Sequence, residues 1–423
     1  MKLLHTSDWH LGNQFNKSEN RDEEFANVLK WFLELVEKEK VDLFLIAGDI
    51  FDVPNPPNDA KRLFYEFVSA LSMTGCRHLV AIGGNHDSAT LLDAPSELYS
   101  LVHPLNLSVI GGIDPENLPR EVILLSDREG VPEAVVCAVP YIPERLLRKV
   151  QPGETSEEKV AKALEGLRNH YDEVSRLAEA KREEVRQRYK KEIPLIVTGH
   201  LFAKGSRSYR SGDDGVRDLT IGGLEGVEFD TFPSTADYIA LGHIHRAYPV
   251  ETRKNVRYSG SIVPLGFDEI DYVKKICLAE FDGTLLSVNE VEIPQFRFLK
   301  NIVVETEPEI YRALDGFEME CGEKVGYFKV KNTGETIPGL YRKIVEYTKG
   351  KNLQCCAAVN VNNRRVEELT SIEEGETFNQ LTETDIFKRR MAEKNISEER
   401  KADLLTLFKE VLTEIDDDAS LEN

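Results

Sequence analysis

Residues 236–247 read ADYIALGHIHRA, an apolar run followed at once by two histidines, His243 and His245. Residues i and i+2 of a β-strand face the same side, so two imidazoles at the end of such a run can converge on one point. This geometry suits a metal ion. The alternative is a pair of surface histidines in a turn, and the rest of the chain distinguishes between the two.

Four other apolar runs end in the same way. Strands are predicted in KLLHT (2–6), VDLFLIA (41–47), HLVAI (78–82) and IPLIVT (193–198), which are followed by SDWH, GDIFD, GGNHD and GH. In open α/β sheets, ligands bind beyond the carboxyl ends of the strands, so we expect the polar residues at these ends to converge. The candidates are Asp8, His10, Asp49, Asn85, His86, His200, His243 and His245.

Carboxylate, amide and imidazole groups without a thiolate suit manganese, iron or zinc better than a structural cysteine zinc site. These candidates exceed the usual coordination shell of one ion, and a carboxylate such as Asp49 can bridge two ions about 3.5–4 Å apart. Two metal ions are therefore expected. The neighbouring glycines are expected to permit tight turns and unusual φ values. They are Gly48, Gly83, Gly84, Gly199 and Gly242.

The first 280 or so residues alternate short apolar runs, EAVVCAV (133–139) among them, with longer amphipathic stretches, which indicates an α/β domain. Nearly continuous hydrophobicity in several runs implies strands buried on both faces, as in a sandwich of layers. Between residues 156 and 193, apolar residues recur every three or four positions, which predicts a long helix. Its basic later part is interpreted as a solvated face with ion pairs rather than a nucleic-acid contact.

Near residues 285–295 the pattern changes to that of a small α+β unit, with strands in IVVETEP, VGYFKVKN and AAVNVN around a helix in IPGLYRKIVEYTKG. The predicted domains are therefore residues 1–285 and 286–365, followed by an acidic linker at 366–381 and a helical tail at 382–423. Two tail helices are predicted, Thr382–Lys394 and Ser397–Ile415. The second has an apolar stripe that fits a partner's groove, although it can also fold back on the first domain.

With 423 residues, 41% of them hydrophobic and 30% charged, the chain has the composition of a globular protein. The N-terminus lacks a signal-peptide pattern and no run of 18 apolar residues occurs, so a cytoplasmic protein without a membrane segment is expected. The six cysteines have no zinc or framework spacing, and most of them are expected to be buried, reduced thiols. The net charge of −21 argues against a surface that coats nucleic acid unaided.

The motifs D-x-H, G-D, G-N-H-D, G-H and G-H-x-H, in this order, resemble the calcineurin-like metallophosphoesterase superfamily. Within it, LLHTSDWHLG, AGDIFD, GGNHDS, ADYIALGHIHRA and YSGSIVPLGFDE resemble bacterial DNA nuclease subunits that work with an SMC-like ATPase. The resemblance spans nearly the whole chain. It is specific in the first 270 residues and looser in the second domain.

The resemblance implies a ligand set for each ion: Asp8, His10, Asp49 and His245 for one, and Asp49, Asn85, His200 and His243 for the other. It implies that the ions are manganese. It also implies that His86 faces the scissile phosphate, where it stabilises charge or protonates the leaving oxygen, and that Asp87 orients His86.

The function implied is that of a DNA nuclease with 3′→5′ exonuclease and hairpin or blocked-end endonuclease activity, acting in recombination, repair and replication. The partner implied is the ATPase, bound through the C-terminal helices, with the nuclease as a homodimer in a heterotetramer. Two positions depart from the family pattern. Asp52 stands where archaeal and eukaryotic relatives tend to carry histidine, which suggests a different contact near the site. Ile262 stands where bacterial relatives often carry proline, which suggests a change in loop packing.

Two other functions share parts of this pattern. A small-molecule phosphodiesterase or a phosphatase has the same chemistry, but serine/threonine phosphatases show G-D-x-x-D-R-G and G-N-H-E where this chain has GDIFDVP and GNHD. A non-catalytic scaffold is disfavoured by intact candidate ligands at every motif. The loop at residues 202–223 either positions DNA or is an ordinary surface loop; its basic residues are Lys204, Arg207, Arg210 and Arg217. Four histidines match no motif and are interpreted as structural or surface residues, namely His5, His78, His103 and His170.

Overall fold

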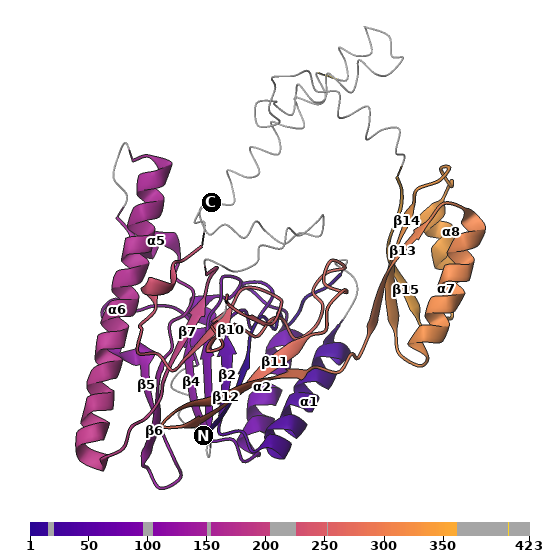
Figure 1. Ribbon diagram of the computed structural model, residues 1–423. Helices are drawn as coiled ribbons and strands as arrows, with labels where there is room; N and C mark the ends of the chain where they lie inside the picture. The colour runs from indigo at the N-terminus through magenta and orange to yellow at the C-terminus, as the bar shows by residue number, and fades with distance from the viewer. Residues whose placement is uncertain are drawn as a thin grey trace. The chain divides into compact units, whose positions relative to one another are not determined.

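The computed structural model describes residues 1–15, 21–95, 105–149, 154–203, 226–251 and 253–361, together with Leu405 (Figure 1). The chain divides into two compact units, one made of Met1–Asn332 and Ile337–Val359, the other of Thr333–Thr336 and Asn360–Asn423. The predicted linker, both predicted tail helices, and the basic residues of the loop at 202–223 lie outside the described residues, apart from helical Leu405. The predicted domain boundaries stay a prediction.

Two six-stranded sheets form the body of the first unit. The first sheet has the order β12 (Thr284–Glu292), β11 (Lys275–Asp282), β1 (Lys2–Thr6), β2 (Leu43–Ala47), β3 (His78–Ile82) and β4 (Asn106–Ile110). The second has the order β5 (Val122–Ser126), β6 (Pro132–Cys137), β7 (Leu195–His200), β8 (Tyr238–Gly242), β10 (Val256–Tyr258) and β9 (Tyr248–Pro249). Strands β1 to β4 are mutually parallel, as are β6, β7 and β8.

Alternating side chains of β2 show how the sheets pack. Leu43, Leu45 and Ala47 belong to a core cluster shared with Val136 and Ala240 of the other sheet, so this cluster fills the space between the sheets. Phe44 and Ile46 point the other way, into a cluster under α1 (Asp22–Glu39) and α2 (Asn58–Ser72). The outer face of the second sheet is covered by α6 (Ser156–Tyr189) (Figure 1). The predicted α/β sandwich is confirmed.

Helix α6 forms where the spacing of apolar residues predicts it. Thr155 and Glu158 make a reciprocal capping box at its start, which satisfies backbone N–H groups that have no partner within the helix. Its buried face includes Leu167, Tyr171 and Val174. Near its end, Arg186 pairs with Glu183 and Glu192, so the basic stretch is a solvated face with ion pairs, as predicted.

Four short elements connect the strands and helices of these layers. They are α3 (Ala89–Asp93), the 3₁₀ turns η1 (Leu118–Glu121) and η2 (Phe229–Thr231), and α5 (Glu144–Leu147). Among the described residues, no helix combines the length and the apolar composition needed to cross a membrane.

The three-stranded sheet has the order β13 (Phe298–Val304), β14 (Gly326–Asn332) and β15 (Leu353–Asn360), with helices α7 (Glu307–Cys321) and α8 (Leu340–Tyr347). The sequence predicted the strands and α8 but not α7. The adjacent cysteines of β15 enter different clusters: Cys355 joins the core under the helices, and Cys356 joins Phe267, Leu299 and Tyr327. All six cysteines are free and buried, as predicted.

Trp9 anchors the segment between β1 and α1. Its ring is fully buried and stacks on Phe32 at 5.8 Å, with Phe44 and Phe67 edge-on at 6.1 and 5.2 Å. Its indole Nε1 donates to Thr6 Oγ1 at 3.0 Å, so the polar atom of this large side chain is also satisfied.

We expect Trp9→Ala to lower the free energy of unfolding by about 3–5 kcal/mol, because it removes a large buried side chain and leaves a cavity. Urea denaturation followed by circular dichroism measures this change. The matched control is Met73→Ala, at a side chain that is 82% exposed, for which we expect a change within about 0.5 kcal/mol. Equal stability of the two variants would contradict the assignment of Trp9 to the core.

Candidate metal centre

The polar residues that follow five strands meet at the junction of the two large sheets. Three groups of side chains have ligand atoms within 4.8 Å of one another. The groups are Asp8, His10 and His245; His10, Asp49 and His86; and Asp8, Asp49 and His200. The convergence follows from topology, because β1, β2 and β3 are parallel in one sheet and β7 and β8 are parallel in the other.

Asp49 lies between two sets of imidazoles. Its Oδ2 is 3.1 Å from His200 Nε2 and 3.5 Å from His10 Nε2. Asn85 Oδ1 lies 3.1 Å from His200 Nε2 and 2.9 Å from His243 Nδ1. Ligand atoms bound to one ion at about 2.0–2.2 Å, at angles between octahedral and tetrahedral values, lie about 3–3.5 Å apart. The observed spacings fit that range, and the position of Asp49 suits a bridging carboxylate.

Two of the imidazoles have a nitrogen that lacks a hydrogen-bond partner. His10 Nε2 and His243 Nε2 are buried, and neither makes a hydrogen bond within the described part of the chain. A buried polar atom without a partner is costly, and native structures usually satisfy it. The donor set of carboxylates, one amide and imidazoles fits divalent ions, so the residues present fit the metal centre that the sequence predicts.

In three of the candidate histidines, Nδ1 lies within hydrogen-bond distance of a specific acceptor. His10 Nδ1 lies 3.1 Å from Asp52 Oδ1, and His245 Nδ1 lies 2.7 Å from Glu269 Oε1. His200 Nδ1 lies 2.9 Å from the carbonyl oxygen of Ala47. Such contacts orient the ring and leave Nε2 for a metal ion. The suggested new contact at Asp52 is therefore a hydrogen bond to a candidate ligand.

Glu269 was missed by the sequence interpretation, although it is the last residue of the quoted YSGSIVPLGFDE stretch. Ser7 was also missed; its hydroxyl donates to Asp8 Oδ2 and accepts from Ser259 Oγ. No spacing rule points to these residues, because each acts through a contact formed only in the folded chain. Ile262 is buried in the core beside α1, and the suggested change in loop packing stays a prediction.

The candidate ligands themselves adopt unusual backbone conformations. Of seven described non-glycine residues with positive φ, four are candidates: Asp8 (51°), His10 (48°), Asp49 (49°) and His243 (96°). Such conformations cost about 1–3 kcal/mol each and gather at functional sites. Backbone hydrogen bonds of 3.0 Å from Asp8 N to Gly48 O and from His10 N to Asp49 O hold two of these turns.

The neighbouring glycines mostly provide space rather than unusual φ, which corrects the expectation from the sequence. Among the five, only Gly48 has a positive φ. A Cβ at Gly84 would lie 2.1 Å from Asp49 Oδ1, and a Cβ at Gly242 would lie 1.9 Å from the Ala47 carbonyl oxygen that holds His200. Side chains at these positions would therefore displace candidate ligands.

The carboxylates of the site shift the pKa values of its imidazoles. Burial disfavours protonation of His10, but its hydrogen bond to Asp52 and the charge of Asp49 outweigh burial and raise its pKa to about 9. Burial is likewise outweighed at His200, where the charge of Asp49 raises the pKa to about 9. Burial and the charge of His200 lower the pKa of His243 to about 3. The cluster of carboxylates thus favours either protons on these rings or divalent ions in their place.

His86 and Asp87 lie beside the candidate ligands but make different contacts. The His86 backbone N–H donates to Asp49 Oδ1 at 2.9 Å, and its Nδ1 donates to the Asp52 carbonyl oxygen at 2.8 Å. Asp87 accepts hydrogen bonds from the backbone N–H groups of Ile50, Phe51 and Gly84. The Asp52 carbonyl therefore holds the His86 ring directly, while Asp87 joins two loops, and the prediction that Asp87 orients His86 stays a prediction. Burial and the charge of Asp49 raise the pKa of Asp87 to about 6.

The described histidines outside the motifs make structural contacts, as predicted. His5 is buried with Nδ1 3.0 Å from the Tyr238 hydroxyl, and burial lowers its pKa to about 3. His78 Nε2 donates to the Ser126 carbonyl oxygen at 2.8 Å. His170 Nε2 lies 2.8 Å from Glu121 Oε2. His103 lies outside the described residues.

Comparison with known proteins agrees with this geometry. Residues 1–247 match the calcineurin-like phosphoesterase family. The chain is 34% identical over 415 residues to the SbcD subunit of the nuclease SbcCD of Escherichia coli K12, an alignment that covers 96% of this chain and 97% of that protein.

Two further relatives have the same name. The SbcD subunit of Bacillus subtilis is 34% identical over 281 residues, which cover 66% of each protein. That of Rhodobacter capsulatus is 33% identical over 290 residues, which cover 67% of each protein. From the family match and these relatives, the chain belongs to the calcineurin-like phosphoesterase family and, within it, to the SbcD-type metal-dependent nuclease subunits.

Proposed function

We propose that this nuclease subunit uses two manganese ions to hydrolyse phosphodiester bonds of DNA, as a 3′→5′ exonuclease and as an endonuclease at hairpins and blocked ends. The observation that supports this most directly is the position of Asp49, whose Oδ2 lies within 3.5 Å of a histidine on each side. One ion is assigned to Asp8, His10, Asp49 and His245, and the other to Asp49, Asn85, His200 and His243.

Such a pair of ions supplies Lewis acidity that makes a water molecule a better nucleophile and neutralises charge on phosphate oxygens. The protein positions the reacting groups. His86 is held by its backbone N–H and by Nδ1, so Nε2 remains for the substrate, where it stabilises developing charge or protonates the leaving oxygen. Asp87 positions His86 indirectly, because it ties the backbone of Gly84 to that of Ile50 and Phe51.

The proposal includes a partner. The relatives are named as the SbcD component of an SbcCD nuclease, so we assign this chain an SbcC-type ATPase as partner and a homodimer within a heterotetramer. The predicted tail helices at Thr382–Lys394 and Ser397–Ile415 are the proposed binding segment, since Leu404, Phe408, Val411 and Ile415 are spaced along one helix face. Six free thiols and a DNA substrate favour the cytoplasm. The alternative of a small-molecule phosphodiesterase or phosphatase is not favoured by the named relatives.

We expect Asp49→Ala to abolish DNA hydrolysis and to lower the bound manganese by at least one ion, because it removes the proposed bridge. Metal analysis of the purified protein and a nuclease assay on hairpin DNA measure the two effects. Asp59→Ala is the control, since Asp59 is exposed and pairs with Arg62 at the surface. Full activity with unchanged metal content in Asp49→Ala would rule out the two-ion assignment.

His86→Ala separates chemistry from metal binding. We expect it to retain both ions and to lose about 10²–10⁴ in turnover, because His86 acts on the transition state. His10→Ala is the matched variant, and it should lose an ion. Since His86 also lies within reach of His10 and Asp49, loss of metal from His86→Ala alone would instead make it a ligand.

Deletion of residues 380–423 should leave hydrolysis of short DNA by the isolated nuclease chain within about twofold of the full chain, because the candidate site lies in residues 8–245. The same deletion should abolish co-purification with an SbcC-type ATPase. Complex formation by the shortened protein would place the interface elsewhere, and the three-stranded sheet would be the next candidate.

A further inference from the structure

The loop between β10 and β11 connects the metal centre to the three-stranded sheet. Glu269, near its middle, is 2% exposed and accepts from four groups of its surroundings. Its Oε1 lies 2.7 Å from His245 Nδ1. Its Oε2 accepts from Ser261 Oγ at 3.3 Å, Leu265 N at 3.0 Å and Lys274 Nζ at 2.5 Å. A carboxylate held this firmly fixes the direction of the His245 ring.

Lys274, at the end of the loop next to β11, also holds His245 and Glu269 in place. Its ammonium group donates to the main-chain carbonyl of His245 at 3.0 Å and to Ser261 Oγ at 2.7 Å. Both the ring and the backbone of His245 are therefore held by one buried ion pair. Desolvation offsets much of the attraction within a buried ion pair, so this pair contributes more to the placement of His245 than its attraction alone indicates for stability.

Phe267, two residues before Glu269, packs on the three-stranded sheet. Its side chain is 3% exposed and clusters with Leu299 of β13, Tyr327 of β14 and Cys356 of β15. Its carbonyl oxygen accepts from Asn301 Nδ2 at 3.0 Å, and Lys329 Nζ lies 4.7 Å from its ring centroid. Residues of all three strands thus belong to the cluster that holds Phe267.

A second series of contacts leads from His10, which is assigned to the same ion as His245, to the cluster that contains Phe267. Asn13 Nδ2 donates to Asp52 Oδ1, the acceptor of His10, at 3.1 Å, and Arg21 donates to Asn13 Oδ1 at 2.8 Å. The Arg21 guanidinium lies 4.0 Å from the centroid of the Phe15 ring. Phe15 in turn lies 5.4 Å from Phe267 and 5.3 Å from Tyr327.

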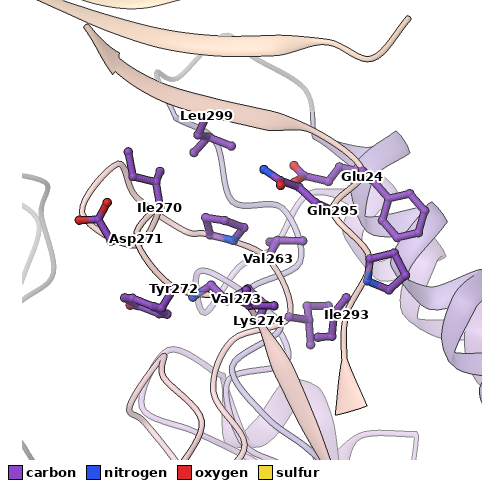
Figure 2. Close-up of a pocket in the computed structure, with 14 residues that line it drawn as sticks. Glu24, Val263, Ile270, Asp271, Tyr272, Val273, Lys274, Ile293, Gln295 and Leu299 are labelled. Atoms are coloured by element: carbon purple, nitrogen blue, oxygen red, sulfur yellow. The ribbon is translucent and has the colours of Figure 1, made fainter. Parts of the chain in front are cut away.

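A cavity of about 180 Å³ borders the loop, so the loop has space in which to move (Figure 2). Both series of contacts reach the lining of this cavity. Glu24, which lines it, pairs with Arg21, and Lys274, which also lines it, pairs with Glu269. Leu299 of the three-stranded sheet and Ile270 of the loop also line it. The loop therefore has free space beside Ile270 and Lys274.

From these contacts we propose that Glu269 is a positioning residue, and that its loop couples the seating of the three-stranded sheet to the metal position served by His10 and His245. The inference rests on the ligands assigned under the proposed function. At the other position, served by His200 and His243, the acceptor of His200 Nδ1 is instead the carbonyl of Ala47, inside the sandwich. The coupling is therefore selective for one ion.

The test is manganese binding to the full chain, monitored by the electron paramagnetic resonance signal of free Mn²⁺, which needs no catalysis. Reference variants His245→Ala and His200→Ala identify the two positions. We expect Glu269→Gln to weaken the His245 position about 10–100-fold and to leave the His200 position unchanged. We expect Phe267→Leu to weaken the same position about threefold or more, although Phe267 touches no ligand.

Two controls have matched chemistry. Glu133→Gln removes a carboxylate that pairs with Arg77 at 2.6 Å. Glu133 lies at the start of β6, whereas the candidate ligands follow the ends of the strands. Phe317→Leu shortens a buried ring in the core of α7 and the three-stranded sheet. Both should bind two ions as the unmodified chain does. If Glu269→Gln does not fold because Lys274 is left unpaired, the charge-neutral variant Glu269→Gln with Lys274→Met replaces it.

Wild-type binding at both positions in Glu269→Gln or in Phe267→Leu would overturn the proposal, as would equal weakening of the two positions. A failed proposed function gives a different result: the unmodified chain would bind two ions and cleave no DNA. Added Mn²⁺ should also restore kcat in Glu269→Gln, since a positioning residue lowers occupancy rather than the rate of the loaded enzyme.

Discussion

The Asp49 carboxylate, buried where the two large sheets meet, is the constraint on which the rest of the site depends. It accepts a hydrogen bond from the His86 backbone N–H and lies close to the imidazoles of His10 and His200. Several anionic groups and partly unpaired imidazoles in one buried place are unfavourable without cations. The left-handed backbone of four candidate ligands is a further cost of the same arrangement, and the close packing at Gly84 and Gly242, which leaves no room for a side chain, is a further constraint on it. Such costs are retained where a site binds something that offsets them.

Much of the sandwich and the candidate ligands can be predicted from the sequence because the signals are local. A strand such as HLVAI (78–82) and the polar residues at its end occupy ten positions of the chain, and the alternation of Phe44 and Leu45 between two cores requires only burial on both faces. Helix α7 was missed because its first two residues, Glu307 and Pro308, are the last two of IVVETEP, which was assigned to a strand. A proline is tolerated in the first helical turn, so the helix begins there.

The contacts that hold the histidines could not be predicted, since they join residues far apart in the chain. Asp52 is 42 residues from His10, and Glu269 is 24 residues from His245. The contacts of Asp87 could not be predicted either. Adjacent residues in a sharp turn need not touch, and here the Asp87 carboxylate satisfies three backbone N–H groups while the His86 ring turns to the Asp52 carbonyl. Spacing rules identify which residues gather, but the fold decides which atoms meet.

The two proposed metal positions differ chemically because their candidate histidines are held by different groups. His10 and His245 each face a carboxylate, from Asp52 and Glu269, whereas His200 faces a neutral main-chain carbonyl. An ionised acceptor raises the basicity of the imidazole and adds negative charge near the ion. The chain as a whole carries −21, of which residues 366–423 account for −10. An acidic protein can nevertheless act on DNA where its carboxylates gather divalent ions, since bound cations reverse the local sign of charge that a phosphate meets. The acidic composition of the chain is therefore compatible with binding of a phosphodiester at the candidate metal centre.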